Sequence, residues 1–526
     1  MKKLNLLLVF ACILFYGCDS DISNTSDKLI PDLNCYSKLI SNIDFAGSLD
    51  TNKWVFVPGK FWNYNEIQTF LPDNSKIENG FFQIQVDQVK EEDSVKYYSS
   101  SRKIEVPENT GRIDIRVNFP TEKGILSALS LRNRNEKYPD YTGLDIAVIR
   151  GLGDGKYGVS FVSRFQGHDG LEHSFGNGGF TAVKDYDDIF HTVTLIKEND
   201  AIFWYFDDKL VNKCYKQSLI PHDYPFNNPM DLFVNVSVDG YWAGPVDVRT
   251  KFPQTLKIDY VKFYEELGIN PNDNLDPLPE FSEYTELEWA LDFNQKEINT
   301  DNWNFDLGDY WWNSEKQAYT DDTSNVFIRD NNLVIKAIET PAHIGTFREY
   351  TSARLNTRKK KNFHFGRLDV RAKLPKTQGM WPAIWVMSTQ EKYGAWPFSG
   401  EIDMMEQHGH ELDKYYTSIH YSGNDSIPVH RKKSDFVKVP WASLNNEFHL
   451  FSLVLEKDQI CWYLDEELVM TFGKRDMIDA RYPFNEKFYL ILNIAVGGGW
   501  PGFPDETTVF PQEMVVDYVR YYTREG

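Results

Sequence analysis

Cysteine is scarce in this chain, with 5 among 526 residues. Cys12 and Cys18 lie in or next to an apolar segment at the N-terminus, and the other three show no spacing typical of a zinc site. Their odd number allows at most one disulfide, and we predict none. Cys461 lies in the apolar run Ile460–Leu464, where we expect it to be a buried small hydrophobe.

Acidic residues outnumber basic residues. The chain has 56 Lys and Arg against 77 Asp and Glu, a formal net charge of −21. We therefore do not expect a nucleic-acid partner, because proteins that bind nucleic acids present a basic patch. Sulfated or uronic polysaccharides are also disfavoured, since an acidic surface repels them. A neutral polysaccharide meets no such repulsion, and an aromatic content of 15% suits both β-sheets and stacking on sugar rings.

Long hydrophobic runs are absent beyond one segment, residues 4–16, which follows the positive start Met1–Lys3. This segment is too short to span a bilayer comfortably and is typical of a secretory signal. It ends in Gly17-Cys18, which resembles a bacterial lipobox, and Asp19–Asp21 then resembles the surface-export signal of Bacteroidetes lipoproteins. We expect an exported protein that is lipidated on Cys18 and held in the outer membrane by this lipid anchor alone, with the cell surface and the inner face of that membrane as the two alternatives for its location. An ordinary cleaved signal with an incidental cysteine is the alternative.

Amphipathic helical patterns are also missing, and hydrophobic residues recur with period two almost everywhere, which predicts an all-β protein. The chain repeats itself, with an offset of 255 residues for one motif and 258 for four others. The matching pairs are Gly111–Arg116 with Gly366–Arg371, Phe190-His191 with Phe448-His449, Trp204–Asp207 with Trp462–Asp465, Tyr224–Asn227 with Tyr482–Asn485, and Asp259–Val261 with Asp517–Val519. We therefore predict residues 1–18 as a signal, 19–40 as a tether, 41–266 and 287–526 as two homologous sandwiches, and 267–286 as a linker.

The second copy contains the acidic stretch Gly400–Gln407. In a regular strand Glu401 and Asp403 share one face, but Glu406 joins them only if a β-bulge at Met404-Met405 absorbs one residue. Three carboxylates on one face are costly and raise each other's pKa values. With the bulge, the carboxyl groups of Glu401 and Glu406 can approach to about 5–5.5 Å, the separation used by retaining glycosidases. A solvent-facing acidic strand is the alternative interpretation of the spacing.

Four ordered motifs resemble glycoside hydrolase family 16. They are the bulged signature Gly400–Glu406, the run Gly379–Trp385 before it, the run Gly497–Gly502 after it, and the closing strand Val516–Arg520. Trp396-Pro397 and His408–His410 are most similar to the laminarinases, which cut β-1,3-glucan. The resemblance implies two concanavalin-like jelly-roll β-sandwiches in tandem. It also implies Glu401 as nucleophile, Glu406 as acid/base and Asp403 as the assisting carboxylate.

Further residues are implied as substrate-binding by the same resemblance. Trp381 and Trp385 are four apart in a strand and share a face, which the family uses as the cleft floor. Trp500 lies on the Gly497–Gly499 turn, where glycines allow close approach of a ligand. Arg354, Asn313 and His420 also match family positions, with a structural role as the alternative for Arg354 and His420. No metal ligand set is recognised and the chemistry requires no cofactor. A structural Ca²⁺, common in the family, is not located by the sequence.

The first copy has lost its catalytic residues. The repeat aligns Asp145 with Asp403 but places Gly143 opposite Glu401 and Val148 opposite Glu406. Neither glycine nor valine can attack a sugar or carry a proton, so we expect this copy to be non-catalytic. It is either a glycan-binding module or a spacer. Its candidate stacking residues are Trp62, Trp204 and Trp242, of which Trp204 pairs with Trp462 and is expected in the core.

The sequence therefore predicts a retaining endo-β-glucanase that acts on neutral β-glucan, with β-1,3-glucan as the first choice of substrate. A mixed-linkage β-1,3-1,4-glucanase is the second choice, and agar or carrageenan a distant third. A non-hydrolytic surface glycan-binding lipoprotein is the rival from another class. The intact set of Glu401, Asp403 and Glu406 argues against it, because a pure binder has no need of three carboxylates that repel one another.

Overall fold

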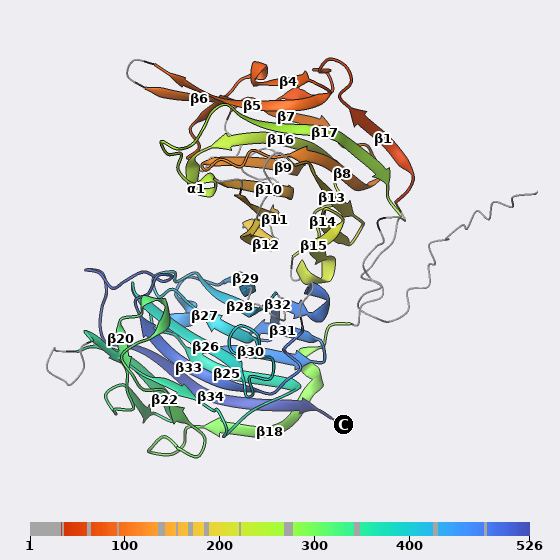
Figure 1. Cartoon of the computed structure of the whole chain (residues 1–526). Helices are drawn as coiled ribbons and strands as arrows, with labels where there is room; N and C mark the ends of the chain where they lie inside the picture. The colour runs from red at the N-terminus through yellow and green to blue at the C-terminus, as the bar shows by residue number, and fades with distance from the viewer. Residues whose placement is uncertain are drawn as a thin grey trace, which may run out of the picture.

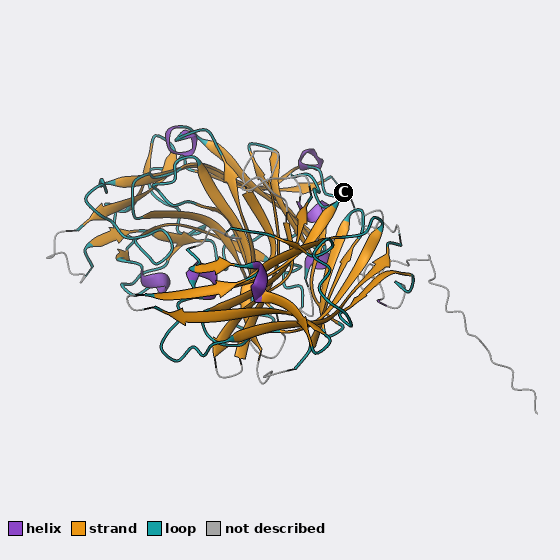
Figure 2. Ribbon diagram, turned by 90° about the horizontal axis from the view of Figure 1, so that it is seen from above, coloured by secondary structure: helices purple, strands orange, loops and turns teal. Residues whose placement is uncertain are grey.

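The computed structural model places the chain in two β-sandwich domains, which lie one above the other in Figure 1. It describes residues 33, 36–59, 65–91, 94–134, 143–153, 156–166, 172–183, 189–219, 222–267, 277–340, 348–423, 430–477 and 481–525. Strands form nearly all of the regular structure, and the helices in Figure 2 are short. The all-β prediction is confirmed. Across the described ranges, no helix combines the length and apolar character needed to cross a membrane.

The N-terminal domain packs a ten-stranded sheet on a seven-stranded sheet. The ten-stranded sheet runs β15-β14-β13-β8-β17-β5-β6-β3, with β1 beside β17 and β4 beside β5. The seven-stranded sheet runs β12-β11-β10-β9-β16-β7-β2. The strands are β1 (Leu39–Asp44), β2 (Val55–Phe56), β3 (Gln68–Phe70), β4 (Ser75–Glu78), β5 (Phe81–Lys90), β6 (Val95–Ser99), β7 (Ser101–Glu105), β8 (Thr110–Asn118), β9 (Ile125–Asn133), β10 (Gly143–Gly153), β11 (Lys156–Gln166), β12 (Glu172–Val183), β13 (His191–Lys197), β14 (Ala201–Phe206), β15 (Lys209–Tyr215), β16 (Met230–Val238) and β17 (Gln254–Glu265).

The C-terminal domain repeats this arrangement. Its ten-stranded sheet runs β32-β31-β30-β25-β34-β22-β23-β20, with β18 beside β34 and β21 beside β22, and its seven-stranded sheet runs β19-β24-β33-β26-β27-β28-β29. The strands are β18 (Tyr284–Asp292), β19 (Asn304–Phe305), β20 (Gln317–Tyr319), β21 (Val326–Arg329), β22 (Asn332–Glu339), β23 (Tyr350–Ser352), β24 (Arg354–Asn356), β25 (Gly366–Lys373), β26 (Met380–Ser388), β27 (Glu401–Glu406), β28 (Lys414–Ser422), β29 (His430–Lys438), β30 (His449–Glu456), β31 (Gln459–Leu464), β32 (Glu467–Gly473), β33 (Phe488–Val496) and β34 (Gln512–Arg524).

The helical segments lie in the connections between strands. They are η3 (Pro72–Asn74), η4 (Lys216–Leu219), α1 (Gly240–Ala243), η6 (Phe281–Glu283), η7 (Trp312–Ser314), α2 (Ser443–Asn446) and η8 (Lys474–Asp476).

The two domains correspond strand for strand, which confirms the internal repeat predicted from the sequence. The order of strands in each sheet is the same in both copies. The buried tryptophans show the same equivalence at the level of atoms. Trp204 Nε1 donates to the carbonyl oxygen of Asp145 at 2.9 Å, and Trp462 Nε1 donates to that of Asp403 at 2.9 Å. Trp204 is therefore a core residue, as its pairing with Trp462 predicts, and it is excluded as a stacking platform.

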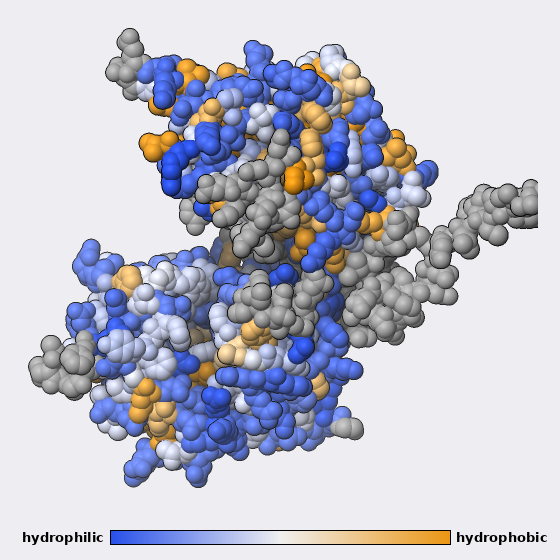
Figure 3. Space-filling view, in the orientation of Figure 1, coloured by the Kyte–Doolittle hydropathy of each residue, from blue (hydrophilic) through white to orange (hydrophobic). Residues whose placement is uncertain are grey.

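The core of each domain lies between its two sheets, because strand side chains alternate and each sheet turns one face inward. Strand β33 is buried at all nine positions, which fits its near-continuous apolar sequence and its place between β24 and β26. Cys461 and Cys214 are buried free thiols in the described structure, as predicted for Cys461. The outer surface, in contrast to the apolar core, carries mostly polar residues. On both domains, the face in Figure 3 is largely hydrophilic, with apolar residues in small scattered groups.

The domains meet through equivalent surfaces. Strand β12 of the first copy lies against β29 of the second, and η4 lies against β32 (Figure 1). The Ser218 hydroxyl donates to Asp476, and these two residues occupy the same position in their respective copies. Lys433 Nζ bridges the interface by donating to the carbonyl oxygens of Ser218 at 2.9 Å and Thr471 at 2.7 Å. The edge strands of the two seven-stranded sheets, β12 and β29, thus lie next to each other within one chain.

Candidate active site

The signature strand β27 contains the predicted bulge. Along its border with β26, Met405 faces Ile384 and Asp403 faces Trp385, so Met404 has no partner of its own. The register with β28 is displaced between Asp403 and Glu406 in the same way. Met404 and Met405 are both buried in the core. The extra residue therefore returns Glu406 to the face that carries Glu401 and Asp403.

The three carboxylates are linked by side chains of neighbouring strands. Ser418 on β28 donates to Asp403 Oδ2 at 2.5 Å, and its oxygen lies 3.4 Å from Glu406 Oε2. His420 Nε2 lies 3.3 Å from Asp403 Oδ2. Asp403 also shares a hydrogen bond with Glu401. Asp403 is only 3% exposed, whereas Glu401 and Glu406 are half-buried. The central carboxyl group is thus held by fixed partners, while the outer two remain accessible.

The protonation of this group is strongly perturbed. Burial raises the pKa of Glu401 and of Glu406, the negative charge of Asp403 raises both further, and the nearby His420 opposes the rise. Burial also raises the pKa of Asp403, against the hydrogen bond from Ser418. Because the three groups titrate together, the cluster retains protons at neutral pH that isolated carboxyl groups would lose. Such a cluster can supply both a general acid and an ionised carboxylate.

Two tryptophans on β26 flank these groups on the same sheet. Trp381 Nε1 donates to Glu406 Oε1 at 3.0 Å, a bond that favours the ionised form of that carboxyl group. Trp385 Nε1 instead donates to Asn493 Oδ1 on β33 at 2.8 Å. Both indoles are partly exposed, while Ala383 between them is buried. Neither is a core tryptophan, and the sequence expectation of one shared face is met.

The Arg354 side chain is largely covered by its neighbours in the wall of the site. Its guanidinium carbon is 5.0 Å from the centroid of the Trp311 ring and 4.7 Å from that of Trp385. Its Nε is 2.9 Å from Asp306 Oδ2. These contacts fix the orientation of Trp385, so the structure favours the alternative of a structural role for Arg354.

Asn313, which matches a substrate-binding position of the family, lies in a turn before strand β20. It lies in the turn η7 with a φ of +62°, and strand β20 begins only at Gln317. Its side chain is exposed, and its carbonyl oxygen accepts a hydrogen bond from the backbone N–H of Gly499 at 2.9 Å. A left-handed conformation is tolerated by asparagine, and it ends the regular alternation here. What Asn313 contributes directly is the position of the Gly497–Trp500 turn.

Trp500 projects from that turn and is 41% exposed. Its ring makes edge contacts with Trp381 at 5.3 Å, His408 at 4.1 Å and Tyr416 at 5.1 Å between centroids. One apolar face thus stays available next to the Glu406 end of the carboxylate group. This geometry suits stacking on a sugar ring.

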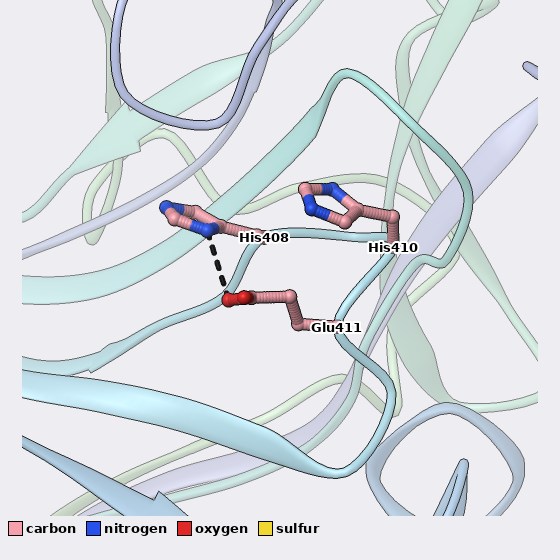
Figure 4. Close-up of side chains that lie close together, drawn as sticks. All are labelled: His408, His410 and Glu411. Carbon is pink, nitrogen blue, oxygen red and sulfur yellow. Dashed lines mark ion pairs between the residues drawn. The ribbon is translucent and has the colours of Figure 1, made fainter. Parts of the chain in front are cut away.

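A histidine cluster beneath Trp500 resembles a metal site at first sight. Ligand atoms of His408, His410 and Glu411 lie within 4.8 Å of one another, and His408 faces Glu411 in Figure 4. The Glu411 carboxylate, however, already binds His408 Nδ1 at 2.9 Å, Tyr416 Oη at 2.7 Å and Lys414 Nζ at 2.9 Å. The ammonium group of Lys414 would repel a cation at that carboxylate. The cluster therefore fits a support for Trp500 better than a metal centre.

A Ca²⁺ ion has no evident set of side-chain ligands in the described parts of the chain. The other group there with metal-ligand spacing is Glu401, Asp403 and His420, which is the candidate active site itself. Calcium takes six to eight oxygen ligands. Neither group provides them from its side chains.

The corresponding site of the N-terminal domain is filled. Its bulge persists, because Asp145 faces Ser130 while Ala147 faces Leu129. A Cβ atom on Gly143 would lie 1.5 Å from Arg132 Nη1, so the arginine occupies the space of the missing nucleophile side chain. Arg132 forms an ion pair with Asp145 at 3.1 Å.

Apolar residues complete this filling. Leu126, Ala128, Val148 and Ala243 form a buried cluster with Trp242 packed against it. Trp242 is thus partly used in packing. Trp62 lies outside the described residues.

Several neighbours of the site were not predicted. Ser418, Tyr416, Asn493 and His430 touch the predicted residues, but they come from strands whose register the sequence alone does not set. Ser418 carries the one usable signal, since it alternates with His420 and so shares its face.

Comparison with known proteins gives the family. The model of glycosyl hydrolases family 16 matches residues 67–262 and 311–520, which together exceed half of the chain. A beta-glucanase of Rhodothermus marinus is 35% identical over 248 residues, or 45% of this chain and 85% of its own length. A glucan endo-1,3-beta-glucosidase of Cryptopygus antarcticus is 34% identical over 254 residues, again 45% of this chain and 92% of its own.

One further match spans a smaller part of a longer relative, and another is to a solved structure. Glucan endo-1,3-beta-glucosidase A1 of Niallia circulans is 35% identical over 261 residues, and this chain spans 38% of that protein's length and matches over 45% of its own. The catalytic domain of an endo-1,3-beta-glucanase (laminarinase) from Thermotoga petrophila RKU-1 is 37% identical, with 46% of this chain and 98% of that domain covered and a TM-score of 0.42. With both copies matched by the family model, the chain belongs to glycosyl hydrolases family 16.

Proposed function

We propose that the protein is a retaining endo-β-glucanase that hydrolyses β-1,3-glucan through its C-terminal domain. The observation that carries this proposal is the bulged strand β27, which places Glu401, Asp403 and Glu406 on one face with raised pKa values. Relatives that are about 35% identical and named as endo-1,3-β-glucosidases support the choice of linkage.

The residues take the following roles in double displacement. Protonated Glu406 donates its proton to the glycosidic oxygen, while the Glu401 carboxylate attacks the anomeric carbon and forms a covalent glycosyl ester. Glu406, now ionised, then takes a proton from water while the water oxygen bonds to the anomeric carbon, and the Glu401 carboxylate leaves. The hydrogen bond from Trp381 stabilises Glu406 in its ionised state between the two steps. Asp403, hydrogen-bonded to Glu401, supports the nucleophile as its charge disappears and returns.

The aromatic residues define the kind of substrate. The Trp500 ring beside Glu406 suits the apolar face of a sugar, and the net charge of −21 suits a neutral chain. A mixed-linkage β-1,3-1,4-glucan meets the same chemistry and is the second candidate substrate. The name of the Rhodothermus relative, a beta-glucanase, leaves that alternative open.

The test is release of reducing sugar from laminarin and from barley mixed-linkage glucan by the full chain, with Glu401→Gln beside it. We expect release from laminarin by the wild type and none by the variant. Faster release from the barley glucan would move the specificity to mixed linkages. No release from either glucan, by a folded protein that still binds them, would refute hydrolysis and favour the glycan-binding lipoprotein.

For the N-terminal domain we propose a non-catalytic, structural role. Arg132 and the Leu126 cluster occupy the space in which the other copy holds its catalytic side chains. Laminarin should therefore fail to perturb the fluorescence of a chain whose C-terminal platform is removed by Trp381→Ala, Trp385→Ala and Trp500→Ala. A remaining laminarin-dependent change would instead support glycan binding by the first copy.

We also propose export and lipidation on Cys18, which lies outside the described residues. The motif Gly17-Cys18 after the apolar segment 4–16 supports this proposal. Radiolabelled palmitate should enter the wild-type protein but not Cys18→Ala, and protease treatment of intact cells tests exposure at the surface. Equal labelling of both proteins would refute the anchor.

A further inference from the structure

A second histidine lies behind His420, on the side away from the carboxylates. His430 is the first residue of β29, and its Nε2 lies 2.7 Å from Nδ1 of His420. The two ring planes differ by 9° and the ring centroids are 5.0 Å apart. With the nitrogen atoms so close, the rings meet edge to edge in nearly one plane, which is good geometry for an N–H···N hydrogen bond. The Trp396 ring packs against His430 at 4.7 Å between centroids.

The hydrogen atoms around His420 can be assigned by counting donors and acceptors. The Ser418 hydroxyl has one hydrogen, and its shortest contact, 2.5 Å to Asp403 Oδ2, uses it. His420 Nε2 lies 3.2 Å from that hydroxyl oxygen and 3.3 Å from the same carboxylate oxygen. Both neighbours therefore offer lone pairs to Nε2, which must carry a hydrogen.

The hydrogen on Nε2 of His420 determines the role of Nδ1 in the same ring. A neutral imidazole has one N–H, so Nδ1 of His420 must accept a hydrogen bond. His430 Nε2 is the group that faces it, and therefore it donates. Burial lowers the pKa of His420 against the pull of Glu401 and Glu406, while burial, His420 and Lys432 lower that of His430 to about 4. Both shifts favour the neutral form of the ring, so each imidazole has one N–H to place.

We propose that His430 is a positioning residue for hydrolysis, which holds His420 in the tautomer that donates from Nε2 to Asp403. The proposal rests on the proposed glucanase function. With Oδ2 of Asp403 occupied by Ser418 and His420, the hydrogen bond between Asp403 and Glu401 holds the proton that these two carboxyl groups share. His430 thus acts at a distance on the proton that accompanies the nucleophile.

Loss of the donor has a defined consequence. If His430 cannot donate, His420 can move its hydrogen to Nδ1 and turn a lone pair toward Asp403. A carboxylate that loses a donor has a higher pKa. The charged groups facing the pair are Glu401, Asp403 and Glu406 on β27 and Lys432 on β29, whereas the group in hydrogen-bond contact with Nδ1 is His430.

The test compares two substitutions of similar shape in the full chain. His430→Gln retains an amide N–H near the position of Nε2, whereas His430→Met has no donor. We expect His430→Met to lower kcat on laminarin by about tenfold to a hundredfold. KM should stay within about twofold, and the acidic limb of kcat/KM should move to higher pH. His430→Gln should stay within about threefold of the wild type without moving the limb, and His449→Met, on the other sheet, is the control.

Imidazole nitrogen NMR of ¹⁵N-histidine-labelled protein gives a readout that needs no activity. We expect His420 to show a protonated Nε2 in the wild type and in His430→Gln, and to lose this state in His430→Met. A protonated Nδ1 on His420 in the wild type would overturn the proposal, and so would equal kinetics of the Gln and Met variants. If the wild type releases no sugar from any glucan, the proposed function fails, while the nitrogen signals still decide the tautomer.

Discussion

Replacing Trp381 with phenylalanine removes one hydrogen bond from the candidate acid/base and leaves most of the aromatic surface in place. The bond runs from Trp381 Nε1 to Glu406 Oε1 at 3.0 Å. A hydrogen bond to a charged group contributes about 1.5–3 kcal/mol. One pKa unit corresponds to about 1.36 kcal/mol. The pKa that governs Glu406 should therefore rise by about one to two units in Trp381→Phe, because the ionised form loses its donor.

The assay is kcat/KM on laminarin as a function of pH. Its alkaline limb reports loss of the essential acid in the free enzyme, which we assign to Glu406 within the coupled group. We expect this limb to move to higher pH in Trp381→Phe. At a pH where Glu406 is fully protonated in both proteins, the initial rates of the wild type and of Trp381→Phe should differ much less than they do on the alkaline limb.

Trp385→Phe is the matched control. This residue lies on the same face of β26, but its Nε1 donates to Asn493 instead of a carboxylate. Its substitution should weaken substrate binding without moving the alkaline limb. An alkaline limb that stays in place in Trp381→Phe, or that moves equally in both variants, would refute the role of the hydrogen bond.

Three further predictions concern Glu406, Trp500 and the contact between the domains. Glu406→Gln should raise thermal stability, and more so at pH 8 than at pH 5. Because the pKa of Glu406 is raised in the folded state, the stability that this group contributes is complete below about pH 4.5 and is lost as pH rises. Calorimetry at both pH values checks this. Trp500→Ala, placed in the Glu401→Gln background to prevent turnover, should weaken binding of a laminari-oligosaccharide by about 1 kcal/mol in calorimetric titration, and unchanged affinity would exclude Trp500 as a platform. Lys433→Ala should lower the free energy of unfolding by about 1–3 kcal/mol in urea, because carbonyl groups of both domains lose their donor, whereas Lys438→Ala at the exposed end of β29 should not.

The sequence was sufficient for those features that depend on local alternation and on the repeat. The bulge followed from the need to bring Glu406 to the face of Glu401 and Asp403. The core position of Trp204 followed from its pairing with Trp462. Both inferences use information within a strand or between two copies of it, which the amino-acid order contains directly.

Contacts that depend on strand register and turn geometry could not be predicted. His430 reaches His420 because β28 and β29 pair with His420 opposite Lys432, which places His430 diagonally across on the same face. Asn313 supports the Gly497–Trp500 turn through its backbone carbonyl because its own backbone adopts a left-handed conformation. Arg132 occupies the space beside Gly143 only because Arg132 faces Gly143 across the ladder. In each case the decisive neighbour is distant in sequence or set by a backbone conformation.

The bulge in the first copy shows what maintains this feature. Gly143 and Val148 have replaced both glutamates, so nothing remains to be aimed, yet one residue is still unpaired after Asp145. Ile146 and Ala147 are fully buried there, as Met404 and Met405 are in the second copy. Removal of the bulge would turn one of these apolar side chains out of the core, at a cost of about 1.5–3 kcal/mol for a large one. Core packing thus preserves the backbone that catalysis uses, and the carboxylates can be lost by substitution without loss of the fold that once positioned them.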